Sequence, residues 1–400
     1  MLSTFAKNAI VLGLLCAVGP FAIDMYLPAL PTIASDLHAS IPATQATLMS
    51  FFIAFGGSQI VYGPVSDAVG RKPPLYFGLA LFTIGSIGCG LSPSIEWLIV
   101  FRFIQGVGAA SVMVIPRAII RDLHTGVEAT RLMSLCMLVL SVSPILAPLT
   151  GSALIVPFGW RAVFAAVTVV ALLGILLTGT VLRETLPAQD RVKVGMKNVL
   201  DGFATLFRHA RFMGLTFIGG LGMASFFTFL ASSSFLYIEH FGLTPTEFSF
   251  AFSVNAIGFI GASQFAAHLG ARFGMGRMVL IAVSMYAAFL SILFALTLAG
   301  VDNLGVLMAL LFLGFASMGV VIPTTMVLAL DDHGPIAGMA SALGGTLQMV
   351  TGGLMIVIMS FFFNGTPLPM VTVMTLCAIA AFLLSLITLR GREIAAQPAE

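Results

Sequence analysis

The chain has 400 residues, of which 59% are hydrophobic and only 8% are charged, and its mean hydropathy is +1.08. The surface of a water-soluble protein must be wetted by polar side chains, so this composition excludes a soluble globular protein. The formal net charge of +2 at pH 7 is too small to indicate a particular partner.

Hydrophobic segments recur along the whole chain, and twelve of them reach the length of about 20 mainly apolar residues that crosses a bilayer. They are 8–33, 43–66, 75–92, 96–117, 131–155, 161–182, 212–238, 246–268, 278–299, 304–329, 335–362 and 368–389. The first is too long for the core of a signal peptide, so we expect it to be a retained span. The sequence therefore predicts an all-α integral membrane protein with twelve transmembrane helices.

Asp24 is the only charged residue of the first segment. A carboxylate at the middle of a bilayer costs roughly 2.5–3.5 kcal/mol on insertion scales, so it marks a functional site by default. Pro20 and Pro28 flank Asp24 at four residues on either side, and Pro28 has no N–H to bond the Asp24 carbonyl. We expect an irregular helix around a carboxyl that carries a proton or cation, the alternative being a carboxyl that only supports packing.

Arg102 lies deep in the fourth segment, and Gln105 shares its helix face. An arginine there must find an anion, a carbonyl group or water. Asp24 is one candidate partner, and the carbonyl groups of the first segment are others. A permanent ion pair would oppose proton uptake by Asp24, so we expect a state-dependent or water-mediated relation between the two.

The longest polar stretch, 183–211, separates six segments from six. We predict an N-terminal six-helix bundle over 1–182, a cytoplasmic linker over 183–211 and a C-terminal six-helix bundle over 212–400. Short basic turns with glycines in register, at Gly70 and Gly274, suggest that the two bundles are related. Fifteen of the eighteen Lys and Arg residues fall on one side if both termini are cytoplasmic, which selects that orientation.

Four short motifs carry a family resemblance. They are Gly63-x-x-Ser66-Asp67-x-x-Gly70-Arg71-Lys72 after the second segment, Phe101-Arg102-x-x-Gln105-Gly106-x-Gly108-Ala109-Ala110 in the fourth, Ala147-Pro148-Leu149-Thr150-Gly151 in the fifth, and Phe21-Ala-Ile-Asp24-Met-Tyr26-Leu-Pro28-Ala-Leu-Pro31 in the first. The first two resemble the loop signature and the conserved-arginine motif of the major facilitator superfamily. The third resembles the antiporter motif of drug:proton antiporters, and the last resembles the Bcr/CflA subfamily of bicyclomycin and chloramphenicol/florfenicol exporters. The sequence departs from these patterns at Ala68, where a basic residue is usual, and at Ala147, where glycine is common.

The resemblance implies a proton-coupled multidrug efflux transporter of a bacterial inner membrane, with two pseudo-symmetric bundles that rock about a central site. It implies that Arg102 supports the cavity and takes part with Asp24 in proton coupling, the alternative for Arg102 being a purely structural hydrogen-bond hub. It assigns a cytoplasmic gate to Gly63, Asp67, Gly70, Arg71, Arg121 and Asp122, in which Asp67 caps the eleventh span near Pro335 and Arg71 meets Asp122. It assigns a sealing face, packed against the C-terminal half, to Pro144, Ala147, Pro148 and Gly151. The alternative to the gate is a solvated loop turn, and the alternative to the sealing face is an ordinary membrane kink.

Polar and aromatic side chains within the spans are candidates for a substrate cavity, although most residues of these types must face lipid or core. The candidates are Asp24, Tyr26, Gln59, Arg102, Gln105, Phe226, Phe227, Asn255 and Gln348.

The sequence contains no phosphate-binding loop of the Gly-x4-Gly-Lys-Ser/Thr type, no nucleophile–base set and no metal-ligand spacing. We therefore expect a transporter rather than an enzyme, with protons as the coupling ion, no cofactor or metal, and no nucleic-acid partner. A small-molecule drug, protons and the lipid bilayer are the expected partners of a monomer. The alternatives are a proton-coupled exporter or importer of a metabolite such as a sugar or amino acid, and a membrane receptor or scaffold.

Overall fold

The computed structural model describes residues 4–124, 126–191, 196–331, 333 and 336–389. Within these residues, twelve helical segments are long and apolar enough to cross a membrane. The predicted all-α membrane fold with twelve spans is therefore confirmed. The orientation of the termini stays a prediction.

The helices follow the predicted segments in order. The first half contains α1 (Thr4–Asp24), the short 3-10 helix η1 (Leu27–Ala29), α2 (Leu30–Asp36), α3 (Ile41–Val69), α4 (Lys72–Leu91), α5 (Ile95–Leu123), α6 (Gly126–Phe158) and α7 (Arg161–Thr180). The connection contains η2 (Ala188–Asp190) and α8 (Met196–Arg208). The second half contains α9 (Ala210–Ser234), the π-helix η3 (Phe235–His240), α10 (Pro245–Phe273), α11 (Met275–Leu298), α12 (Leu304–Asp331), α13 (Ala337–Phe362) and α14 (Pro367–Leu389).

One helix boundary differs from the sequence prediction, and the predicted linker contains a helix. The fourth span was expected to end near Arg117, but α5 continues to Leu123, so Arg117 lies within the helix. The polar stretch after α7 was expected to be a linker without spans, and it contains the strongly amphipathic helix α8. A search for long apolar runs does not reveal such a helix, because its apolar residues are separated by polar ones along the sequence and gather on one face only once the helix forms.

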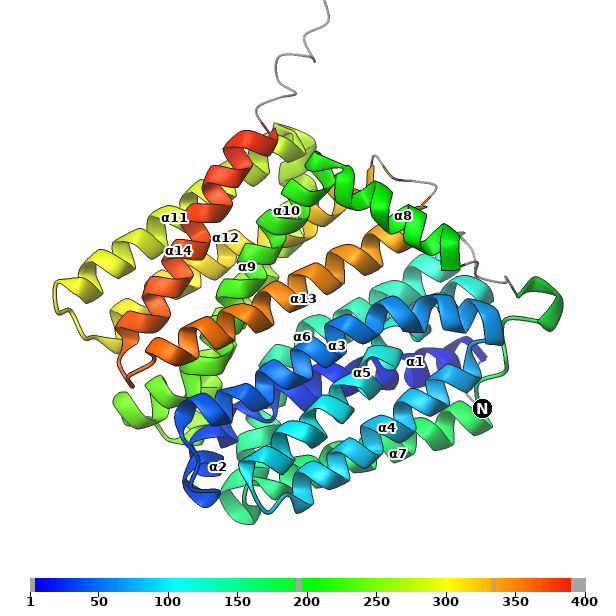
Figure 1. Ribbon diagram of the computed structural model, residues 1–400, viewed down its shortest axis with the longest axis horizontal. Coiled ribbons are helices and arrows are strands. Elements are labelled where there is room, and N and C mark those ends of the chain that lie inside the picture. Colours follow the sequence, from blue (N-terminus) through cyan, green and yellow to red (C-terminus); the bar gives the residue numbers. More distant parts are fainter. Residues whose placement is uncertain (1–3, 125, 192–195, 332, 334–335, 390–400) are drawn as a thin grey trace, which may run out of the picture. The chain divides into compact units, whose positions relative to one another are not determined.

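The chain divides into two compact units (Figure 1). Unit 1 comprises 1–198 together with 244–250, and unit 2 comprises 199–243 and 251–400. The first turns of α10 therefore belong with the N-terminal helices. The bundle boundaries drawn from the sequence, at 182 and 212, stay a prediction.

Close helix packing fixes α5 within unit 1. A Cβ atom built on Gly106 would collide with the Phe51 carbonyl oxygen of α3, and one built on Gly108 would collide with the backbone of Phe82 on α4. Without side chains at these positions, α3 and α4 approach the α5 backbone directly. As a result, the face of α5 that carries Arg102 is turned inward and held in place.

Aromatic packing joins α9 to α10 and α12 in unit 2. The Phe226 ring lies 5.9 Å from Phe315 and 6.5 Å from Phe259, measured between ring centroids. The Phe229 ring stacks on Phe252 at 5.7 Å and also contacts Phe315. We call these five side chains the aromatic cluster. The π-helix η3 follows α9 directly, and such segments often occur at functional sites.

Candidate functional site

Helix α1 breaks immediately after Asp24. The Met25 N–H still bonds the Phe21 carbonyl at 3.1 Å, but Pro28 lies in the first turn of η1 and has no N–H to offer the Asp24 carbonyl. By contrast, Pro20 lies inside α1 without ending it. The expected irregularity is thus present on one side of Asp24, and it places the carboxyl at a helix end.

The Asp24 side chain is buried, with 5% of the residue exposed. Its carboxyl makes no hydrogen bond or ion pair with any residue that the structure describes. A carboxyl removed from water and given no cation favours its protonated form. The site therefore has the chemistry of a proton carrier rather than of a structural ion pair.

Arg102 is fully buried, and it bonds the helix that carries Asp24 without pairing with the Asp24 carboxyl. Its Nη1 donates to the Ala22 carbonyl at 3.1 Å and to Gln105 Oε1 at 2.6 Å. Its guanidinium carbon lies 4.6 Å from the Tyr26 ring centroid and 4.5 Å from that of Phe51. The two aromatic faces stabilise the charge by cation–π attraction. Nε and Nη2 have no hydrogen-bond partner among the described residues.

A chain of hydrogen bonds holds this arrangement. Gln105 Nε2 donates to Ser86 Oγ at 2.8 Å, which orients the amide that accepts from Arg102. The Tyr26 hydroxyl and Thr47 Oγ1 lie 2.7 Å apart, which fixes the ring under the guanidinium. Ser86 and Thr47 were not among the sequence candidates, because buried hydroxyl residues are common in membrane helices and nothing in their spacing distinguishes these two.

The predicted antiporter motif packs against the break in α1. A Cβ atom on Gly151 of α6 would collide with the carbonyl oxygen of Met25, the residue after Asp24. Helix α6 runs without interruption through Pro144 and Pro148, and Ala147 is fully buried. The Pro148 carbonyl accepts a hydrogen bond from Ser249 Oγ at 2.9 Å, in the part of α10 that belongs to unit 1. The motif therefore supports the segment that positions Asp24.

A second group of charges surrounds Arg71, in the turn between α3 and α4. Arg71 Nε donates to Asp122 Oδ2 at 2.8 Å, and Nη1 donates to Ser66 Oγ at 2.9 Å and contacts Asp67. Burial would lower the pKa of Arg71, but its hydrogen bonds to Asp122 and Asp67 outweigh this and raise the pKa. Gly70 has a φ of 101°, which favours glycine, and this turn brings Arg71 into place.

Glu184 joins this group, and the sequence analysis missed it. Its Oε1 accepts from Arg71 N at 2.8 Å, and its Oε2 accepts from Lys72 N at 3.0 Å, where α4 begins. Burial would raise the pKa of Glu184, but backbone N–H groups of Lys72, Arg71, Leu186 and Thr185 bring it below its ordinary value. The sequence places this carboxylate four residues after the end of α7 but does not show that it reaches the N-terminus of α4, where a helix favours negative charge.

Of the other predicted gate residues, Gly63 joins these contacts through its carbonyl, which accepts a hydrogen bond at 2.9 Å from Ser66 Oγ, the hydroxyl that also accepts from Arg71. Arg121 is exposed. The expected contact of Asp67 near Pro335 involves a residue outside the described ranges. We therefore keep the gate as a prediction.

The remaining cavity candidates lie on several helices. Gln59 is partly exposed on α3, and Phe226 and Phe227 lie on α9. In unit 2, Asn255 is 3% exposed and Gln348 is 8% exposed. These two amides are therefore the buried polar candidates of that unit.

Both buried amides carry unsatisfied polar atoms. Neither polar atom of the Asn255 amide has a hydrogen-bond partner in the described residues, although the Tyr237 side chain lies close enough to interact with it. Gln348 Nε2 also has no hydrogen-bond partner there, and it lies near Gly219 of α9 and Thr325 of α12. Both amides can therefore still form hydrogen bonds with a ligand.

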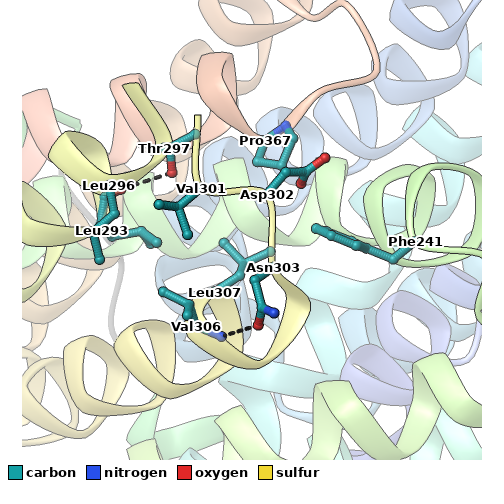
Figure 2. A pocket seen from close by; sticks show the side chains of 10 residues that line it. All are labelled: Phe241, Leu293, Leu296, Thr297, Val301, Asp302, Asn303, Val306, Leu307 and Pro367. Carbon is teal, nitrogen blue, oxygen red and sulfur yellow. Dashed lines mark hydrogen bonds between the residues drawn. The ribbon is translucent and has the colours of Figure 1, made fainter. Parts of the chain in front are cut away.

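Figure 2 shows a recess beside Phe241, Asp302 and Asn303, with a volume of about 10 Å³. A space of this size holds at most one water molecule. None of the predicted cavity residues lines it, so it is not a candidate for the substrate site. Among the described residues, no group of three or more His, Cys, Asp and Glu side chains is arranged to hold a metal ion.

Comparison with known families decides the general class of the protein. Residues 12–357 match the model of the Major Facilitator Superfamily. The chain belongs to this superfamily. It is therefore a multi-pass membrane transporter of small molecules and not an enzyme, and the resemblance inferred from the motifs is confirmed.

Three curated bacterial relatives cover most of the chain. The uncharacterized MFS-type transporter YdgK of Bacillus subtilis is 34% identical and covers 86% of each chain. The bicyclomycin resistance protein homolog of Haemophilus influenzae is 28% identical, and the multidrug resistance protein MdtL of Escherichia coli is 27% identical; each alignment covers 94% of both chains. Their origin is consistent with a bacterial inner membrane.

Solved structures show the same fold at low sequence identity. A D-xylose–proton symporter matches with a TM-score of 0.74 at 16% identity, over 96% of this chain and 97% of that chain. A bacterial homolog of the human lysosomal transporter Spinster matches with a TM-score of 0.72 at 15% identity, over 98% of this chain and 96% of that chain. These similarities establish the superfamily fold and carry no information on the substrate.

The contact between Gly151 and the Met25 carbonyl leads to a stability prediction. Gly151→Ala should lower the apparent melting temperature of the purified protein, because the added methyl group displaces the backbone after Asp24; overpacking of this kind costs about 1–3 kcal/mol. Gly57→Ala is the matched control, because a Cβ atom there meets nothing within 4 Å. Equal melting temperatures for the two variants would show that packing of the motif does not stabilise the chain segment after Asp24.

The Glu184 contacts lead to a pH-dependent prediction. Because the pKa of Glu184 is lowered on folding, its carboxylate stabilises the protein above the ordinary carboxyl pKa of 4.5, and this contribution is lost as the pH falls through the lowered value. At neutral pH, Glu184→Gln should therefore be less stable than the wild type by about 1 kcal/mol, the size of a helix cap. The difference should shrink in melting curves recorded toward pH 4.

Asp201→Asn serves as the control for this series, because Asp201 is exposed on α8. We expect it to melt like the wild type throughout. A stability difference between Glu184→Gln and the wild type that stays the same at every pH would contradict the proposed role of the carboxylate.

Proposed function

We propose that this chain exports small apolar or amphipathic antibiotics, of the amphenicol or bicyclomycin type, in exchange for protons by alternating access. The observation that carries the proposal is the Asp24 carboxyl, which is buried at a helix break without a cation or hydrogen-bond donor among the described residues. The names of two relatives, a bicyclomycin resistance protein homolog and a multidrug resistance protein, support export of drugs.

In the proposed cycle, Asp24 takes up a proton from the outside and becomes a neutral carboxylic acid. It releases that proton to the inside when the drug binds and the cavity reaches cytoplasmic water. Arg102 keeps its charge throughout, because its hydrogen bonds run to Ala22 and Gln105 and its guanidinium lies between two rings. Its proposed role is to place positive charge near the site without pairing with Asp24, which leaves the carboxyl free to titrate.

Unit 2 supplies the proposed drug contacts. The aromatic cluster offers ring faces that suit flat apolar groups. The Asn255 amide, whose two polar atoms lack hydrogen-bond partners among the described residues, would bond an amide or hydroxyl group of the drug. A buried polar group left unpaired costs about 1–3 kcal/mol, and a ligand that pairs with it recovers that cost. An amphenicol has both an aromatic ring and such polar groups.

The proton gradient is sufficient for this exchange. One proton that moves down one pH unit yields about 1.4 kcal/mol, and one net charge that moves through 100 mV adds about 2.3 kcal/mol. The sum of about 3.7 kcal/mol supports a drug gradient of several hundredfold at one proton per neutral drug.

Proton-coupled transport of a metabolite such as a sugar or amino acid is the second candidate, because the same buried carboxyl would serve it. A receptor or scaffold is a third candidate, and it would need no titratable group at Asp24. The direction of the coupled flux separates these possibilities.

The test is transport of labelled florfenicol by the purified protein in proteoliposomes with an imposed pH gradient. The wild type should accumulate the drug when the lumen is acidic, because drug and proton move in opposite directions. Asp24→Asn should fall to the level of protein-free vesicles, while Asp201→Asn transports normally. Full gradient-driven accumulation by Asp24→Asn would refute the assignment, and accumulation only with an alkaline lumen would indicate symport.

A further inference from the structure

Unit 1 contains a recess of about 890 Å³ that the proposed drug and proton path does not use. It lies between the beginning of α1, the first residue of α4 and the chain that leaves α7. Its lining includes Lys7, Asn8, Lys72, Leu177 and Arg183. We call it the Lys7 recess.

The polar lining of the Lys7 recess is suited to an anion. Three of its side chains are cationic (Lys7, Lys72 and Arg183), and Glu184 is its one carboxylate. The oxygens of Glu184 already accept four backbone N–H groups, which offsets the carboxylate charge. Lys72 Nζ donates to the Leu182 carbonyl at 2.8 Å, which places the ammonium group at the wall and leaves it two further donors.

Asn8 provides a second, independent indication of a ligand. It is 7% exposed, and its amide makes no hydrogen bond with any residue that the structure describes. A buried amide of this kind is costly unless a ligand or water pairs with it. Because Asn8 lines the recess, that partner would have to lie inside it.

The apolar surroundings indicate that the anion has a hydrocarbon tail. Ile10, which also lines the recess, is 55% exposed, and Leu173 and Leu176 on α7 are 45% and 58% exposed. Leu173 and Leu176 lie on α7 within the turn before the lining residue Leu177, and α1 and α7 both cross the membrane. The acyl chains of a bound lipid would lie against this apolar surface.

We propose that the Lys7 recess binds the phosphate headgroup of an anionic phospholipid, with its acyl chains against Ile10 and the exposed leucines of α7. Lys7, Lys72 and Arg183 belong to the predicted cytoplasmic side, where basic groups near a membrane surface attract anionic lipids. None of the residues of the recess belongs to the drug or proton contacts proposed above.

The test counts bound lipid on the purified, delipidated full-length protein by native mass spectrometry during titration with dioleoylphosphatidylglycerol. The wild type should retain one phosphatidylglycerol in preference to dioleoylphosphatidylcholine. The double variant Lys7→Gln/Arg183→Gln should bind it at least about tenfold more weakly, because each basic group near the surface contributes about a factor of five. Arg272→Gln, which removes one exposed charge near the end of α10, should bind it like the wild type.

Two further arms keep the proposal open to refutation. Inorganic phosphate alone should neither occupy the protein nor displace phosphatidylglycerol; if it does both, the site holds a free anion and not a lipid. Each single variant, Lys7→Gln and Arg183→Gln, should show a smaller loss of phosphatidylglycerol binding. These variants give a result even if the double variant does not fold. Equal retention of phosphatidylcholine and phosphatidylglycerol, or wild-type retention by the variants, would overturn the proposal.

Discussion

A carboxyl group held out of water without a cation is the constraint on which the other features of unit 1 depend. Burial of the Asp24 carboxylate would cost less free energy beside Arg102, which lies in the same unit and bonds Ala22, two residues earlier. Instead, Nη1 of the guanidinium bonds Gln105 and the Ala22 carbonyl, and the group lies against two aromatic rings, while Nε and Nη2 have no hydrogen-bond partner among the described residues. The arginine is thus stabilised without forming an ion pair with Asp24, and the carboxyl remains able to take up and release a proton.

Backbone irregularity and close packing place the carboxyl. Pro28 removes the N–H that would have continued α1, and Gly151 lets α6 approach the irregular backbone that follows. Irregular backbone is tolerated at membrane depth only where protein or water covers it, and here α6 provides the cover. Elsewhere in unit 1, Glu184 caps the start of α4 and ties the chain that leaves α7 to the Arg71 turn. The proton site and the loop motif are therefore both products of packing within one unit.

The sequence predicts the features that depend on local composition. Twelve apolar segments, a lone carboxyl and a proline one turn later are visible in the residues themselves, and each has a counterpart in the structure. The partners of Arg102 and the role of Glu184 are not visible, because they depend on which helices approach each other. Helix α8 escapes a search for apolar runs, since its apolar residues alternate with polar ones at the helical period. Pro20 shows the limit of proline as a signal, because α1 passes through it unbroken.

The central claim is that drug binding and protonation of Asp24 exclude one another. The most direct measurement is the release of protons when florfenicol is added to the purified protein in weakly buffered solution. The wild type should release up to one proton per drug bound, and Asp24→Asn should bind the drug without releasing any. Equal proton release by the two proteins, or drug binding by the wild type with no release at any pH, would contradict a proton carrier at Asp24.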